Sequence, residues 1–209
     1  MQNTDTKDWE LTVGLEVHIQ LSTQTKMFCR CKSAYGLEPN SLTCPICLAM
    51  PGALPVINHE AINMAVKLGH ALNFNINCDT SFSRKNYYYP DLPKGYQITQ
   101  FNDPICKNGF LNIKDNNEEY KVRITRAHLE EDSGKLIHHS DNCSFVDLNR
   151  AGSPLIEIVS EPDLHSSKHA KLYLEKLKQI IRYIDISDCN MEKGNLRVDI
   201  NVSIRKKGA

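Results

Sequence analysis

The chain has 209 residues, 41% of them hydrophobic, and its 25 basic and 25 acidic residues leave a formal net charge of zero. This composition supports a well-formed core in one large or two small domains, and it argues against a surface that holds nucleic acid by bulk charge. No apolar run approaches the ~20 residues of a membrane span, and the polar N-terminus lacks the features of a signal peptide. We therefore expect a cytoplasmic protein with no membrane partner.

Residues 1–10 are predicted to form a disordered lead, followed by one α+β domain over residues 11–209 with a largely antiparallel sheet and flanking helices. The first strand covers residues 11–21, where apolar residues alternate with Glu16, His18 and Gln20. Because side chains alternate across a strand, these three polar groups share one face.

Four of the eight cysteines lie in a loop-rich segment over residues 29–47, as the pairs Cys29 and Cys31, then Cys44 and Cys47. Two close pairs at this separation are typical of a tetrahedral Zn²⁺ site with four thiolates. Such a site leaves no position open for substrate, so the zinc would be structural. The alternative for these four residues is a set of unrelated buried thiols. The other four cysteines of the chain are isolated, and we expect them to be small buried side chains.

A helix is predicted over residues 59–72, with Asn58 as its N-cap and its apolar residues on one face. A loop rich in tyrosine and proline follows over residues 84–104. Its tyrosines either stack on a base or pack on the domain, and Lys94 is a candidate to reach a phosphate.

Two weakly alternating strands, residues 109–113 and 119–130, lead into a charged segment over residues 126–135. Gly134 allows a sharp turn that would return Lys135 towards the acidic residues that precede it. This segment would supply a metal ligand and a phosphate-binding cation, or it is a solvated hairpin tip.

Arg150 lies in a turn over residues 149–154 that is either a phosphate cradle or an ordinary turn. The strand that follows, residues 155–159, is apolar except for Glu157. An ionised carboxylate in such a strand must be paired, metal-bound or directed into a polar cleft. A helix over residues 167–184, capped by Ser166, comes before a last strand over residues 196–205, which carries Asp199.

If these strands share a sheet, one face gathers Glu16, His18, Glu157 and Asp199. Clustered oxygen ligands suit Mg²⁺, which usually accompanies a nucleotide phosphate. The sequence contains no P-loop, dinucleotide-binding fingerprint or nucleophile elbow, so a nucleotide would be held in another way.

Five blocks occur together and in order, at residues 14–18, 89–97, 128–132, 149–163 and 196–203. With these blocks the chain resembles, over residues 9–205, the N-terminal cradle portion of the B subunits (GatB) of aspartyl/glutamyl-tRNA amidotransferases. The resemblance implies a catalytic fold like that of glutamine synthetase. It also implies that Glu16, His18, Glu131 and Glu157 hold Mg²⁺, with Glu130 and Asp199 as weaker candidates, and that the cysteines form the zinc-bearing version of this family.

The activity implied by the resemblance is phosphorylation by ATP of the side-chain carboxylate of Glu-tRNA(Gln), Asp-tRNA(Asn) or both. Ammonia released by the partner A subunit then displaces phosphate, and a C subunit clasps A and B together. The family continues with the rest of the cradle, a helical domain and a tail domain, so we expect this 209-residue chain to be inactive alone.

Two other functions remain open from the residues themselves. The same carboxylates would serve a metal-dependent nuclease or phosphatase. The cysteine loop and the tyrosine loop would also suit a zinc-stabilised tRNA-binding module without catalysis.

Overall fold

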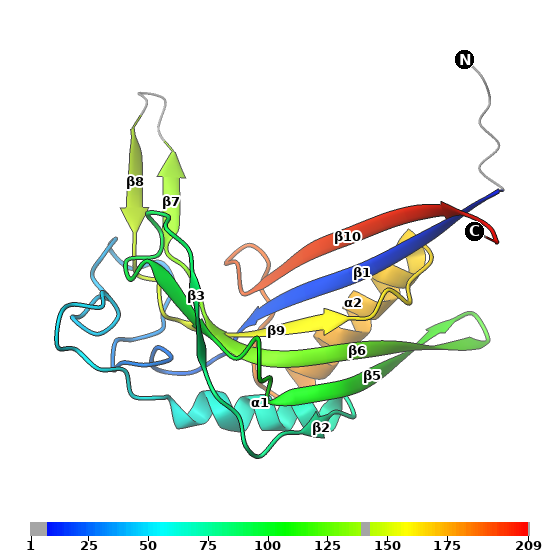
Figure 1. Ribbon diagram of the computed structural model, residues 1–209, viewed down its shortest axis with the longest axis horizontal. Helices are drawn as coiled ribbons and strands as arrows, with labels where there is room; N and C mark the ends of the chain where they lie inside the picture. The colour runs from blue at the N-terminus through cyan, green and yellow to red at the C-terminus, as the bar shows by residue number, and fades with distance from the viewer. Residues whose placement is uncertain (1–7, 139–142, 209) are drawn as a thin grey trace.

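The computed structural model describes residues 8–138 and 143–208, and this part of the chain forms an α+β structure (Figure 1). Residues 1–7 of the expected lead lie outside the described residues, whereas residues 9 and 10 already belong to the first strand. The elements in chain order are β1 (Trp9–Gln20), α1 (His59–Ala71), β2 (Asn75–Ile76), β3 (Ser83–Asn86), β4 (Tyr96–Thr99), β5 (Cys106–Asp115), β6 (Glu118–Glu131), β7 (Lys135–His138), β8 (Ser144–Asp147), β9 (Pro154–Ser160), α2 (Ser167–Tyr183) and β10 (Leu196–Lys206).

One sheet of eight strands dominates the structure, and all of its pairings are antiparallel. Its main path runs β10-β1-β9-β6-β4-β3, and β5 pairs with both β6 and β2. Strands β7 and β8 pair only with each other and stand apart at one end (Figure 1). The largely antiparallel α+β class predicted from the sequence is confirmed.

Helices α1 and α2 cover one face of the large sheet (Figure 1). Each begins at the predicted cap: the Asn58 side chain accepts a hydrogen bond from the backbone N–H of Glu60, and Ser166 accepts one from His169. The core lies between these helices and the odd-numbered residues of β1, including Leu15 and Val17. No helix among the described residues is long and apolar enough to cross a bilayer.

The opposite face of the sheet is polar in its centre because four strands align their polar positions there. His18 of β1 is opposite Arg197 of β10 on one side and Glu157 of β9 on the other. Glu157 in turn is opposite His128 of β6. These four residues, which are far apart in the sequence, therefore form one row across the sheet.

Two segments differ from the sequence-based expectations. The expected loop over residues 84–104 contains β3 and β4, which pair with each other on either side of the tyrosines. Gly134 does not turn Lys135 back towards the acidic residues, because the chain leaves β6 after Glu131 and Lys135 starts β7, which pairs with β8. The alternative of a hairpin tip at this point is also wrong, since β6 and β7 are not paired with each other.

Candidate functional site

The polar face carries a cluster of carboxylates and imidazoles around the central row. Ligand atoms of Glu16, His18 and Glu157 lie within 4.8 Å of one another, and so do those of His128, Glu130 and Glu157. We call these five residues, together with Asp199, the acidic cluster. The sheet thus brings together Glu16, His18, Glu157 and Asp199, the four residues that the alternation of the strands placed on one face.

His18 lies between Glu130 and Asp199 in this cluster. Its Nδ1 lies 3.2 Å from a carboxylate oxygen of Glu130, and its Nε2 lies 3.4 Å from Asp199. Burial lowers the pKa of His18, but the carboxylates of Glu130 and Glu157 outweigh it, and the pKa is raised. Burial has the opposite effect on Glu130, whose pKa it raises. His128 and His18 beside Glu130 outweigh this effect and hold the pKa of its carboxyl at about 2.

His128 is fully buried, and neither of its ring nitrogens has a hydrogen-bond partner. Its Nε2 faces Glu157 at 3.5 Å and Glu130 at 3.7 Å, both beyond good hydrogen-bonding distance. Burial raises the pKa of Glu157, and the attraction of His128 opposes this only in part. Glu157 and His128 are therefore incompletely satisfied, as expected of groups that await a ligand.

Two adjoining cavities of about 560 Å³ and 290 Å³ open over the acidic cluster and share His18, Glu130, Glu157 and Asp199. In the described part of the chain, six buried side-chain nitrogen or oxygen atoms lack a hydrogen-bond partner. Five of the six belong to residues that line these cavities, and they are Asp91 Oδ1, Thr99 Oγ1, Arg126 Nε and both nitrogens of His128. Unpaired polar atoms are rare in proteins, so their concentration here indicates a ligand-binding site.

Cations line the larger cavity together with the carboxylates. Asp132, which is almost fully buried, accepts two hydrogen bonds from Arg197 at 2.9 Å and 3.1 Å and lies 3.5 Å from Nε of Arg150. Arg150 also donates to the carbonyls of Ser133 and Gly134. One buried carboxylate thus holds two arginines that are each about one third exposed at the cavity. Lys85 lines the same cavity.

The structure places Glu131 apart from the acidic cluster. Neighbouring residues of a strand point to opposite faces, so Glu130 faces the cluster and Glu131 faces the helix side. There its carboxylate pairs with Lys94 and accepts a hydrogen bond from the backbone N–H of Ile98. Burial raises the pKa of Glu131 in spite of Lys94. The two residues that we expected to bind Mg²⁺ and phosphate are therefore engaged with each other.

Lys135 also lies away from the cluster. It is exposed and lines a third cavity of about 570 Å³, which meets the larger cluster cavity at Arg150 and Arg197. Tyr87, by contrast, lines the larger cluster cavity, and its ring lies 5.8 Å from that of Tyr89.

Four residues of the site received no role of their own from the sequence, and they are His128, Arg126, Asp132 and Arg197. The alternation of Arg126, His128 and Glu130 with Ala127 and Leu129 is the signal that would have found the first two.

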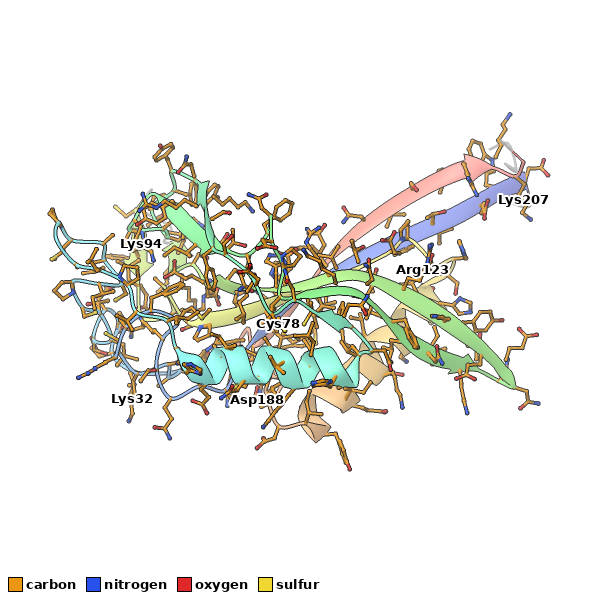
Figure 2. All side chains as sticks on the ribbon, turned by 60° about the horizontal axis from the view of Figure 1, so that its bottom comes forward. Lys32, Cys78, Lys94, Arg123, Asp188 and Lys207 are labelled. Carbon is orange, nitrogen blue, oxygen red and sulfur yellow. The ribbon has the colours of Figure 1, made fainter. Side chains whose placement is uncertain are left out.

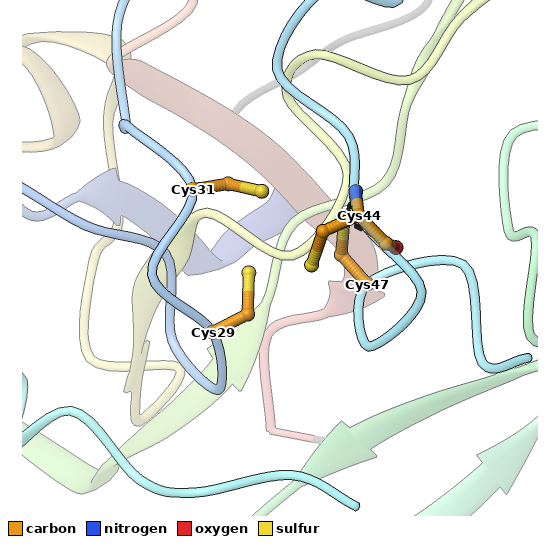
Figure 3. A group of neighbouring side chains, drawn as sticks. All are labelled: Cys29, Cys31, Cys44 and Cys47. Atoms are coloured by element: carbon orange, nitrogen blue, oxygen red, sulfur yellow. Dashed lines mark hydrogen bonds between the residues drawn. The ribbon is translucent and has the colours of Figure 1, made fainter. Parts of the chain in front are cut away.

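The four cysteines of the loop segment form a second site, beyond the end of the sheet. Their sulfurs all lie within 4.8 Å of one another, and Figure 3 shows them converging from two stretches of chain. Zn–S bonds of about 2.3 Å in a tetrahedron need sulfurs about 3.8 Å apart, so this quartet fits a zinc ion with small shifts. The other four cysteines are not part of this group, and the expectation that they are buried is confirmed for Cys106 and Cys189 and wrong for the exposed Cys78 and Cys143.

The sulfurs of the quartet already interact with one another. The hydrogen bond with Cys29 lowers the pKa of Cys47 to about 4, whereas the same interaction raises that of Cys29. Burial, followed by the hydrogen bond with Cys44, raises the pKa of Cys31 to about 11. Four thiols this close, with one already favoured as thiolate, form a donor set for a thiophilic cation rather than a disulfide pair.

Comparison with known proteins is consistent with this geometry. Residues 11–209 match the family described as the GatB/GatE catalytic domain. The chain is 56% identical over 201 residues to the B subunit of the aspartyl/glutamyl-tRNA(Asn/Gln) amidotransferase of Persephonella marina. The corresponding identities are 58% over 200 residues for Campylobacter curvus and 54% over 201 residues for Thermodesulfovibrio yellowstonii.

Each of these alignments covers 96% of this chain and 42% of the relative, so the chain spans less than half the length of the curated relatives. The family match extends over nearly all of the chain and includes every strand of the acidic cluster. We conclude that this chain belongs to the GatB/GatE catalytic-domain family.

Proposed function

We propose that the acidic cluster is the site at which ATP phosphorylates the side-chain carboxylate of a glutamate or aspartate esterified to tRNA, so that ammonia can convert it to the amide. The observation that carries this proposal is that one cavity is lined by both kinds of charged group. Its lining includes His18, Glu130, Glu157 and Asp199 as well as Lys85, Arg150 and Arg197. A triphosphate with its metal ion needs both kinds of group at once.

The chemistry requires activation because a carboxylate has no leaving group that ammonia can displace at neutral pH. One carboxylate oxygen of the substrate attacks the γ-phosphorus of ATP, the bond to the bridging oxygen breaks, and ADP leaves. Ammonia then attacks the carbonyl carbon of the acyl phosphate, and inorganic phosphate departs with the former carboxylate oxygen. The task of the protein is to align these anions and balance their charge.

The residues of the cluster fit a hard divalent cation, and Mg²⁺ when bound would neutralise the phosphates and orient the γ-phosphorus. Glu130 and Glu157 offer carboxylate oxygens beside the unpaired His128, and Glu16 offers another beside His18 and Glu157. His18 is held in place by Glu130 and Asp199. We therefore retain Glu16, His18 and Glu157 as proposed ligands and assign to Glu130 the place expected for Glu131.

Arg150 and Arg197 are proposed to bind the phosphates. Asp132 fixes both guanidinium groups before a ligand arrives, which reduces the entropy lost on binding. Lys94 is proposed to act indirectly, because its pairing with Glu131 fixes the tyrosine loop against the end of β6. Tyr87 on that loop lines the cavity and is a candidate to stack on the adenine.

The relatives are named as the B subunits of amidotransferases that act on tRNA(Asn) and tRNA(Gln). We accordingly propose that the protein acts in cytoplasmic translation together with a glutamine-hydrolysing A subunit and a small C subunit. Residues 11–209 are proposed to form a cradle domain with a zinc loop over residues 29–47.

The test is transfer of the γ-phosphoryl group of ATP by the complete enzyme, with its partner subunits and Glu-tRNA(Gln), in the absence of glutamine and ammonia. Glu157→Gln removes one carboxylate of the cluster at nearly constant shape, and Glu161→Gln is the matched control. Glu161 follows β9 outside both cavities, where it accepts a hydrogen bond from Thr125.

We expect phosphate turnover that needs charged tRNA, falls by about 100-fold or more in Glu157→Gln, and stays near wild type in Glu161→Gln. Turnover that is indifferent to Glu157→Gln would remove the acidic cluster from the reaction. Tight tRNA binding without any ATP use would favour the RNA-binding module.

A further inference from the structure

Lys26 is a fully buried lysine beside the cysteine quartet, and the acidic cluster makes no use of it. Its Nζ lies 3.8 Å from Sγ of Cys47. It also donates to the carbonyl oxygens of Leu42 at 2.7 Å and Leu148 at 3.3 Å. Its backbone N–H donates to the carbonyl of Cys31 at 2.9 Å. Lys26 thus touches both cysteine pairs of the quartet and the segment that leads to β9.

Among the described residues no carboxylate oxygen lies within 4.0 Å of this buried ammonium group, since Lys26 takes part in none of the ion pairs there. A lysine is almost never fully buried without a partner of opposite charge, because removing the charge from water is costly. The two carbonyls satisfy hydrogen bonds but carry no net charge. Among the hydrogen-bond partners of its Nζ in the described part of the chain, only the sulfur of Cys47 can become an anion.

The charge of a filled quartet supplies the missing partner. Four thiolates around one divalent zinc ion carry a net charge of −2, and of the four cysteines Cys47, the one beside Lys26, is the buried one. A buried ammonium at the edge of that site brings the total to −1. Within the quartet, the sulfur that Lys26 contacts is that of Cys47. This sulfur also accepts a hydrogen bond from the backbone N–H of Cys44 at 3.1 Å.

Lys26 is enclosed next to Gly152 and Cys47. Its Cδ lies 3.7 Å from the position that a Cβ on Gly152 would occupy, and Cys47 lies equally close to that position. Gly152 has a φ of +84°, which favours glycine, and its carbonyl accepts a hydrogen bond from Met27 N–H. The neighbouring Glu131 is occupied by Lys94.

We propose that Lys26 is the built-in counter-cation of the cysteine quartet, holding the Cys47 sulfur through an N–H···S hydrogen bond and offsetting part of the negative charge of the metal-loaded site. It is a positioning residue, since it acts through Cys47 rather than on the metal. The role concerns metal binding by the loop and is independent of the reaction proposed for the acidic cluster.

The test is zinc affinity of the full chain, measured by competition with a chromophoric chelator. Lys26→Met keeps the length and the apolar stem but removes the charge, and Lys26→Gln keeps a hydrogen-bond donor without the charge. Lys32→Met is the matched control, because Lys32 follows Cys31 in the same loop yet is exposed at the surface (Figure 2).

We expect Lys26→Met and Lys26→Gln to bind zinc about 10- to 100-fold more weakly than wild type, and Lys32→Met to stay within about twofold. Zinc affinities of both Lys26 variants equal to that of Lys32→Met would overturn the proposal.

A second readout separates charge balance from simple packing. The rise in melting temperature on adding zinc to chelator-treated protein should be smaller in the Lys26 variants than in wild type. A purely structural lysine would lower the melting temperature equally with and without zinc, which would leave that rise unchanged and contradict the proposal.

Discussion

The acidic cluster and the cysteine quartet are both groups of metal-ligating side chains, but the chain builds them in opposite ways. The quartet comes from one short segment, residues 29–47, and its four sulfurs leave no position for a further ligand. The cluster comes from four strands that lie far apart in the sequence, and two cavities open over it. A site closed by local ligands suits a structural role, whereas a site assembled by strand register and open to a cavity suits chemistry.

The comparison predicts that residues of the cluster contribute to activity and not to stability. Glu16→Gln is expected to lower phosphoryl transfer by about 100-fold or more while leaving the melting temperature unchanged or raised, because it removes one of several clustered like charges. Turnover assays and calorimetry on the same preparation check both parts. A fall in melting temperature equal to that of a core variant would place Glu16 in the scaffold instead.

The quartet should show the reverse pattern. Cys47→Ser is expected to abolish stoichiometric zinc binding and to lower the melting temperature by about 10 °C, since several kcal/mol of metal-dependent folding energy is lost. Metal analysis together with calorimetry measures this, and Cys78→Ser, an exposed cysteine outside the quartet, is the control. Full zinc occupancy in Cys47→Ser would show that the metal lies elsewhere.

Gly152 lies beside the quartet, where a Cβ would be 3.7 Å from Cys47 Cβ and 3.6 Å from Oε1 of Glu131, the acidic residue that faces away from the cluster. Its φ of +84° is strained for any residue with a side chain. Gly152→Ala is expected to lower the free energy of unfolding by about 1 kcal/mol, measured by denaturant titration. Gly36→Ala, also at positive φ but with open space around it, isolates the backbone contribution.

A surface ion pair outside both sites should have the smallest effect. Arg123, hydrogen-bonded to Asp163, holds the pKa of that carboxyl below its ordinary value. A carboxyl whose pKa is lowered by folding stabilises the folded protein at pH above its unfolded-state pKa of about 3.9. This contribution is lost as the pH falls through its pKa in the folded state. Because Arg123 is largely exposed, we expect Asp163→Asn to cost under about 1 kcal/mol at pH 7.

Melting curves of wild type and Asp163→Asn between pH 7 and pH 3 measure this dependence. The difference between the two proteins should shrink below about pH 4. A difference that stays constant over this range would mean that the carboxylate charge is not responsible.

The sequence predicted most of the regular structure, because the patterns involved are local. The spacing of apolar residues and the caps Asn58 and Ser166 placed both helices to within about one residue. The alternation in β1 and β10 put Glu16, His18 and Asp199 on one face. The short strands β3, β4, β7 and β8 were missed, since each is only four residues long and carries little periodic signal.

The details of the site depended on information that the sequence does not hold. Glu130 is the exception, because its alternation with Leu129 and His128 already places it, rather than Glu131, on the face of the cluster. The pairing of Glu131 with Lys94 and the burial of Lys26 beside Cys47 are contacts across long sequence separations. No local pattern indicates them.

We propose that the chain carries two independent metal sites, an open one on the sheet and a closed one in the loop. Binding of Mn²⁺, as a spectroscopic substitute for Mg²⁺, can be followed by electron paramagnetic resonance on the zinc-loaded full chain, with Glu161→Gln as control. We predict that the double variant Glu16→Gln and Glu157→Gln loses Mn²⁺ binding and keeps its zinc. Unchanged Mn²⁺ binding in the double variant, or loss of zinc along with it, would contradict the account.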